Sequence, residues 1–213
     1  MTTHEAVLGF ALVAALLTLV PGLDTALVLR TSLTGTRRRA FATAAGIQAG
    51  CLAWGAAAAL GATAVLAASA TAYRVMTLLG AAYLVWMGAR MLLASWRTAP
   101  GHDPAAPPPA PPSAARGFAT GLATNLLNPK VGVFYLATIP QFSVPGVLPL
   151  VMGLLLASVH CLIGSVWLGG LVLGSSALGA RLTTTAFARW VDRVTGGVLV
   201  LFGARVALSA RAL

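Results

Sequence analysis

Leu19-Val20-Pro21-Gly22-Leu23-Asp24 interrupts a long apolar run near the start of the chain, and Leu127-Asn128-Pro129-Lys130 interrupts another. Each proline lies twelve residues after the glycine of a repeated motif, Gly9-Phe10-Ala11 and Gly117-Phe118-Ala119, and the copies are 108 residues apart. Proline lacks an N–H and clashes with the preceding helical turn, so each interruption predicts a broken helix. Paired interruptions at matching positions of two halves are typical of a transporter's binding site.

The composition indicates a protein that lies in a lipid bilayer. Of the 213 residues, 58% are apolar and only 8% are charged, and the mean hydropathy is +0.88. A soluble domain carries about a quarter charged residues. The net charge of +10 raises the question of nucleic acid, but the arginines are scattered between apolar runs, so we expect no nucleic-acid partner. Cys51 and Cys161 fall in apolar runs and are interpreted as small packing residues.

Six apolar runs meet or approach the roughly 20 residues that a helix needs to cross the hydrocarbon core. Their length and their Ala/Leu-rich composition favour helices over strands. The predicted fold is an all-α integral membrane protein of six transmembrane helices, arranged as two inverted three-helix repeats, with helices 1 and 4 broken at Pro21 and Pro129. The predicted spans are residues 6–29, 41–68, 73–95, 117–140, 147–173 and 191–208.

A proline-rich segment divides the chain into halves. Seven of the twelve prolines lie within residues 100–112, which predicts a semi-rigid solvated spacer. The expected organisation is a first repeat over 1–98, a cytoplasmic linker over 99–115 and a second repeat over 116–213, within one membrane domain. Three spans per half make the second half enter from the opposite side, which gives an inverted repeat. Residues 80–90 and 195–205 align as the third spans, and both end in Gly-Ala-Arg.

The arginines predict the orientation of the spans. Ten positive residues lie in or beside the loops that join spans 1 and 2, 3 and 4, and 5 and 6, whereas three lie on the other side. Positive residues accumulate on the cytoplasmic side of membrane proteins. We therefore expect a multi-pass protein with these three loops in the cytoplasm and with both termini outside.

Asp24 follows the first interruption and is, apart from Asp192 at a span end, the only carboxylate within the predicted spans. The adjacent breakers Pro21 and Gly22 free backbone groups that must face protein or a wet cavity. A buried acid costs about 2.5–3.5 kcal/mol on insertion scales. Asp24 is therefore a candidate proton carrier or a partner for a substrate ammonium. The alternative is that Asp24 caps the half-helix after the break.

Lys130 is the only lysine of the chain and directly follows the second break at Pro129. Two interpretations stay open: it meets a carboxylate, either Asp24 or that of a substrate, or it extends from a helix end to the membrane interface. Asn125 and Asn128 are three residues apart and share one helical face. Such a face can line a cavity or can bond neighbouring helices.

Gln48, Gln141 and His160 are weaker candidates for the same site. For Gln48, a structural hydrogen bond is the favoured interpretation. His160 could help to transfer protons, although one histidine within a span is weak evidence. We expect no cofactor and no metal site.

Small residues four apart, at Gly46 and Gly50 and at Gly170 and Gly174, indicate close helix packing. The packing could lie within one chain or between two, so a homodimer is compatible with the sequence.

Taken together, these motifs resemble the lysine exporter superfamily, the LysE/RhtB-type amino-acid exporters. The resemblance covers essentially the whole chain outside the proline-rich segment. It is carried by residues 19–24, the Gly46 region, residues 79–88, Phe118 and Gly121, residues 125–130, residues 140–142 and the glycine-rich sixth span.

The resemblance implies a bacterial inner-membrane protein that exports a small amino acid or a derivative, driven by the proton gradient. Its partners would be the lipid bilayer, the amino-acid substrate and protons. Leu23 stands where the family usually has a second proline, which keeps one backbone N–H and puts the substrate in doubt. The residues that match the family's signature are Pro21, Gly22, Asp24, Asn125, Asn128, Pro129 and Lys130.

Two other function classes fit the sequence less well. An exporter of a metal cation or another small ion would fit the same fold, but Asp, Glu, His and Cys are scarce within the spans. An intramembrane enzyme is disfavoured because Ser165 and His160, five residues apart, are about 140° from a shared helical face. No nucleophile elbow or zinc-protease motif is present either. We therefore expect no enzyme.

Overall fold

The computed structural model describes residues 1–20, 22–96, 113–182 and 185–210. Pro21 and most of the predicted linker lie outside the described residues. Within them no strand is present, so the prediction of an all-α protein is confirmed. The helices are α1 (Thr3–Leu19), α2 (Leu23–Thr34), α3 (Arg37–Ala68), α4 (Ala70–Ala94), α5 (Ala114–Leu126), α6 (Pro129–Thr138), the 3-10 helix η1 (Ile139–Phe142), α7 (Pro149–Leu182) and α8 (Thr185–Ser209).

The first and fourth predicted spans each correspond to two helices. α1 ends at Leu19 and α2 begins at Leu23, and the chain bends by 53° between them. α5 ends at Leu126 and α6 begins at Pro129. Both interruptions therefore separate half-helices, and each leaves helix ends whose backbone groups need partners.

Length and apolar composition identify two helices of the described chain as able to cross a membrane, Arg37–Val65 and Pro149–Gly174. The bent pair of α1 and α2 makes a third crossing if it is one span. A shorter apolar helix runs over Gly196–Leu208. By this criterion the described chain has two or three membrane-spanning segments, and the six-span arrangement stays a prediction.

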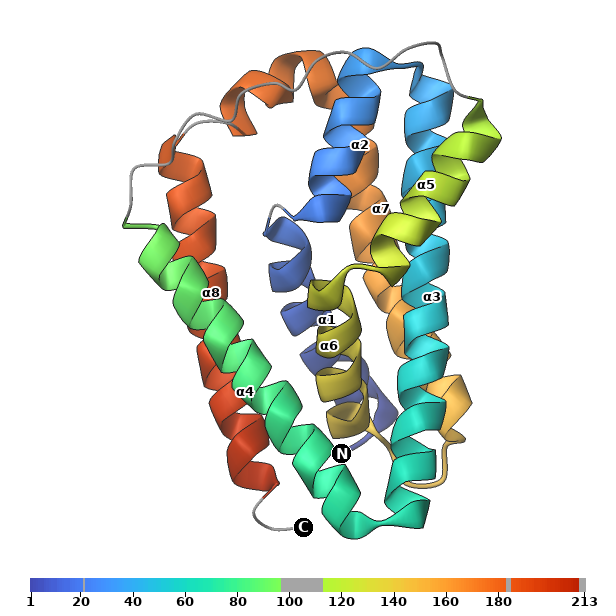
Figure 1. The fold of residues 1–213 in the computed structure, drawn as a ribbon, viewed down its shortest axis with the longest axis vertical. Helices are drawn as coiled ribbons and strands as arrows, with labels where there is room; N and C mark the ends of the chain where they lie inside the picture. Colours follow the sequence, from blue (N-terminus) through green and yellow to red (C-terminus); the bar gives the residue numbers. More distant parts are fainter. Residues whose placement is uncertain (21, 97–112, 183–184, 211–213) are drawn as a thin grey trace.

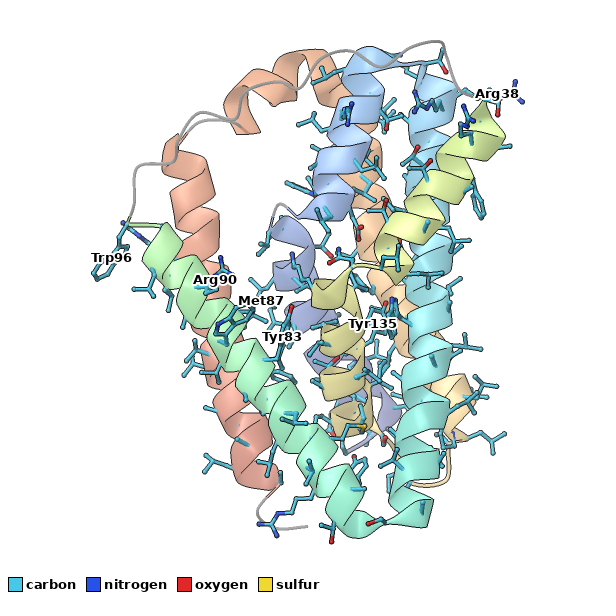
Figure 2. All side chains as sticks on the ribbon, viewed as in Figure 1. Arg38, Tyr83, Met87, Arg90, Trp96 and Tyr135 are labelled. Carbon is cyan, nitrogen blue, oxygen red and sulfur yellow. The ribbon has the colours of Figure 1, made fainter. Side chains whose placement is uncertain are left out.

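The molecule is an elongated bundle (Figure 1). α4 and α8 form a pair on one flank, α3, α5 and α7 lie on the other, and α1, α2 and α6 lie between them. α1 begins and α8 ends at the same end of the bundle. Arg38, in the first turn of α3, lies at the opposite end (Figure 2).

α3 and α5 approach each other so closely that glycine backbones are in contact. A Cβ at Gly46 would collide with the backbone of Phe118, and a Cβ at Gly121 would collide with the backbone of Thr43. Gly50 faces the side chain of Asn125. The expected packing role of Gly46 and Gly50 is therefore found within the chain, and the homodimer stays a prediction.

α3 and α7 cross through a reciprocal set of small residues. A Cβ at Gly55 would lie 2.5 Å from the Cβ of Ala157, and a Cβ at Gly153 would lie 2.6 Å from the Cβ of Ala59. Each glycine also faces the carbonyl oxygen of the other. Moving four residues forward on α3 thus moves four residues backward on α7, so the two helices are antiparallel.

α4 and α8 cross in the same reciprocal way. A Cβ at Gly88 would lie 2.5 Å from the carbonyl oxygen of Gly196 and 2.9 Å from the Val200 side chain. A Cβ at Gly196 would lie 2.7 Å from the carbonyl oxygen of Gly88 and 2.9 Å from the Leu92 side chain. These contacts place Gly88 opposite Gly196. A Cβ at Gly203, which the sequence alignment equates with Gly88, would lie 2.9 Å from the carbonyl oxygen of Ala81, which the alignment equates with Gly196.

An aromatic cluster fills the bundle towards the end where α1 begins. Phe10 is fully buried and contacts Phe134, Tyr135 and Phe142 at ring-centroid distances of 5.9, 6.4 and 5.7 Å. Phe142 stacks in turn on Phe202 of α8, with centroids 6.0 Å apart. These rings join α1, α6, η1 and α8, and they hold the half-helices α1 and α6 in place beside the two breaks.

Candidate functional site

The first break leaves carbonyl groups at the end of α1 that a side chain from the other half satisfies. The Lys130 ammonium donates to the carbonyl oxygen of Leu17 at 3.2 Å and to that of Val20 at 3.1 Å. Gly22 is the N-cap of α2 and makes no side-chain capping bond. A Cβ added at Gly22 would lie 3.4 Å from the Lys130 nitrogen. The only lysine of the chain is therefore inserted into the break of the first half.

At the second break, the capping bond is made by a neighbouring residue in the same segment. Asn128 is the N-cap of α6, and its side-chain oxygen accepts the Lys130 backbone N–H at 3.1 Å. Pro129 takes the first helical position, where its missing N–H costs nothing. The carbonyl oxygen of Asn125 accepts the Asn128 N–H at 3.1 Å and the Trp54 indole N–H at 3.3 Å.

Asp24 follows the first break and forms a hydrogen bond with Asn125, which precedes the second break. It lies in the first turn of α2, and its Oδ2 accepts a hydrogen bond of 2.8 Å from the side-chain amide of Asn125 on α5. Its Oδ1 is buried and has no hydrogen-bond partner, and the same holds for Oδ1 of Asn125. Asp24 therefore faces α5. Its Oδ1 accepts no backbone N–H of α2, so this oxygen does not make the capping bond that the alternative interpretation requires.

A cavity of about 50 Å³, partly open to the outside, lies between the two breaks. α1, α2, α3, α6 and α7 all contribute to its walls. Apolar walls come from residues such as Ile47, Val131 and Leu168. The polar and charged lining consists of Thr18, Asp24, Thr25, Gln48, Asn128, Lys130 and His160, with the Trp167 indole beside them.

His160 is held in one orientation by bonds to both ring nitrogens. The Thr18 hydroxyl donates to the carbonyl of Ala14, so its oxygen accepts from Nε2–H of His160 at 3.1 Å. Nδ1 pairs with the Tyr135 hydroxyl at 2.9 Å. The bond to Thr18 therefore places a proton on Nε2. Tyr135 lies in the middle of the bundle (Figure 2) and also stacks on the His160 ring.

The two predicted glutamines occupy different places. Gln48 lines the cavity, and its amide donates to the Ser165 hydroxyl at 3.2 Å, so a structural bond is present as expected. A Cβ at Gly164 would lie 2.8 Å from the Gln48 amide nitrogen, so a larger residue there would make that amide shift. Gln141 lies in η1, away from the lining of this cavity.

Sequence reasoning missed several residues of the site. Trp54 donates to the Asn125 carbonyl at the second break, and the Tyr135 hydroxyl pairs with His160. Trp167 lies beside the cavity with a buried indole N–H that has no hydrogen-bond partner. Buried indole and phenol groups need hydrogen-bond partners, so aromatic residues with polar tips inside predicted spans were the available signal. Within the described ranges, no three His, Cys, Asp or Glu side chains come together in a way that could hold a metal ion.

Comparison with known proteins shows the family of the chain. The LysE type translocator family matches residues 15–210. The chain belongs to this family. It is therefore a membrane transporter and not an enzyme, and the resemblance read from the two interrupted spans is confirmed.

Relatives of this translocator match along nearly its whole length. The uncharacterized membrane protein YrhP of Bacillus subtilis (strain 168) is 27% identical over 210 residues, covering 96% of this chain and all of YrhP. Homoserine/homoserine lactone efflux proteins of Salmonella typhimurium and Salmonella typhi are 28% and 27% identical over 209 residues, covering 98% of both chains in each case. No solved structure matches the translocator.

Proposed function

We propose that this translocator exports a small neutral amino acid or a derivative from the cytoplasm in exchange for protons. The observation that carries the proposal is the pair of opposite charges in one cavity, the Lys130 ammonium and the Asp24 carboxylate. An amino-acid zwitterion presents the complementary pair. In the proposal its carboxylate lies beside Lys130 and its ammonium beside the unpartnered Oδ1 of Asp24.

The rest of the cavity supports a neutral side chain on the substrate. Gln48, Thr18 and Trp167 offer amide, hydroxyl and indole groups, while the remaining wall is apolar. A charged substrate side chain would lose its hydration without gaining an ion pair from these groups. The names of the two Salmonella relatives, homoserine/homoserine lactone efflux proteins, agree with a small neutral substrate.

The proposed proton site is Asp24. Its carboxylate has one oxygen without a hydrogen-bond partner, and it lies against the cavity through which substrate passes. Binding of a proton there would remove the charge that holds the substrate ammonium. Substrate and proton would then compete for one group, which is a direct route to exchange of one for the other.

The proposed transport mechanism uses two inverted repeats of three spans each. The crossing of α4 and α8 supports this, because the alignment of residues 80–90 with 195–205 equates Gly88 with Gly203 and Ala81 with Gly196, and Gly88 contacts Gly196 while Gly203 contacts Ala81. Inverted repeats allow one half to rock against the other around a central site. We place the protein in the bacterial inner membrane, with the arginine-rich end in the cytoplasm and both termini outside.

Inside-out inner-membrane vesicles test the function. With an acidic interior generated by respiration, uptake of labelled homoserine should exceed uptake into vesicles that lack the protein, and an uncoupler should abolish the excess. Lysine and glutamate, with charged side chains, should be poor competitors. The absence of gradient-driven uptake for every neutral amino acid and lactone tested would contradict the proposal, and flux of a divalent metal instead would favour the ion-exporter alternative.

A further inference from the structure

The two cysteines of the chain face each other across the crossing of α3 and α7. The antiparallel register set by the contacts of Gly55 with Ala157 and of Ala59 with Gly153 puts Cys51 opposite Cys161 one turn further along. On the other side of the cysteines, Gln48 contacts Gly164 in the same register. The thiol pair is therefore bracketed by direct contacts between the two helices on both sides.

The hydrogen bonds of the thiols agree with this register. The Cys161 thiol donates to the backbone carbonyl of Gln48, at 3.4 Å, so it is directed at α3. The Cys51 sulfur lies 3.5 Å from the Asn125 amide that also binds Asp24. Cys51 also lines the cavity. Cys161 therefore contacts α3 directly, and Cys51 contacts Asn125, which binds Asp24.

We propose that Cys51 and Cys161 form a dithiol that a two-electron oxidant converts to a disulfide, which ties α3 to α7 and stops transport. Two S–H bonds break and one S–S bond forms, and the two electrons and two protons pass to the oxidant. With a diazene such as diamide, they reduce the N=N bond to a hydrazine. A disulfide needs Cα atoms about 4.4–6.8 Å apart, a spacing that glycine-mediated helix contact one turn away favours.

The effect on transport rests on the proposed function. α3 and α7 form opposite parts of the same cavity wall, through Gln48 and Cys51 on one helix and His160 and Gly164 on the other. A cavity that opens and closes between two halves requires these helices to change their relation. A covalent bond between Cys51 and Cys161 would hold that relation fixed.

Counting thiols tests the bond itself. Because the chain contains two cysteines, any disulfide within one chain must join Cys51 to Cys161. Membranes are treated with diamide and denatured, and free thiols are labelled with a polyethylene-glycol maleimide. We expect two labels per chain before treatment and none after it, on a band that stays monomeric without reductant. Two labels after treatment, or a covalent dimer, would overturn the proposal.

Transport measured on the same membranes tests the consequence. We expect diamide to stop uptake in the wild type and dithiothreitol to restore it, while Cys161→Ala transports normally and is insensitive to diamide. Cys161→Ser, which keeps a donor for the Gln48 carbonyl, serves as a second variant in case the alanine substitution impairs folding. A wild type that is fully bridged and transports as before would overturn the inference. If the untreated protein moves no amino acid, the proposed function fails, while the thiol count still decides the bond.

Discussion

The two helix breaks share a position in their halves but not a way of satisfying their backbone. At the second break, Asn128 caps α6 with its own side chain, and Trp54 donates to the Asn125 carbonyl. At the first break, the N-cap is Gly22, which makes no side-chain bond, and the free carbonyls of α1 depend on Lys130 from the other half.

The difference indicates that the first break is the one whose conformation can change. A break that is capped by its own Asn128 side chain depends less on its neighbours, because only the Trp54 donation comes from another helix. A break that depends on a single long side chain loses its partners when that side chain moves. Lys130 is therefore both the structural partner of the first break and, in the proposed mechanism, the cation that binds substrate.

The largest effect is expected from Asp24→Asn, which removes the charge that the first break contributes to the cavity. Gradient-driven uptake into inside-out vesicles should fall at least about tenfold, equivalent to about 1.4 kcal/mol. The amide has nearly the same shape, so yield and thermal unfolding should stay close to wild type. Glu5→Gln is the matched control, because Glu5 is exposed and lies in the capping box of α1. Wild-type uptake by Asp24→Asn would remove this carboxylate from the mechanism.

Lys130→Met should come next, because it leaves the first break without its donor. An unsatisfied buried acceptor costs about 1–3 kcal/mol, and two carbonyls are affected. We expect a clear fall in the thermal unfolding midpoint in detergent together with loss of uptake. Lys130→Arg keeps charge and donors and should recover part of the stability, while Arg116→Met, at an exposed arginine, should change little. An unchanged midpoint for Lys130→Met would show that the first break does not depend on it.

A smaller effect is expected at the second break from Asn128→Ala. Loss of an N-cap side chain costs about 0.5–2 kcal/mol. Asn128→Asp and Asn128→Ser keep an acceptor for the Lys130 N–H and should retain most of the stability. Thermal unfolding of the three variants side by side checks this. If alanine and serine behaved alike, the self-capped description of this break would be wrong.

The smallest effect is expected from Gly22→Ser, which gives the first break the cap that it lacks. The φ of Gly22 is −134°, which any residue adopts, and the added Cβ would be in ordinary contact with the Lys130 nitrogen. Replacing glycine by serine at an N-cap gains only a few tenths of a kcal/mol. Differential thermal unfolding should detect a slight gain. A marked loss instead would mean that Lys130 needs the open space beside Gly22.

The sequence was sufficient to locate both breaks and the residues that line them. A proline inside an apolar run can also mark a simple kink, but the matched spacing in the two halves made residues 19–24 and 127–130 recognisable as paired breaks. Asp24, Asn128 and Lys130 do line one cavity, and Asn125 holds Asp24 beside it. The roles of these residues in transport are a proposal.

Other features depended on packing that the sequence does not encode locally. Lys130 has a long flexible side chain, and its bonds to the carbonyls of Leu17 and Val20 follow from how α6 lies against α1. The contact of Gly88 with Gly196 was not predicted, because a repeat alignment equates residues of the two halves and does not say which residues meet where the helices cross.

The bond from Lys130 to Val20 spans 110 residues of chain, which has a consequence for biosynthesis. The first three helices leave the ribosome and reach the membrane well before the lysine that completes α1 has been made. Until Lys130 arrives, the carbonyls at the end of α1 must be hydrated or held by the insertion machinery. The first half therefore reaches its final structure only after the second half has been inserted beside it.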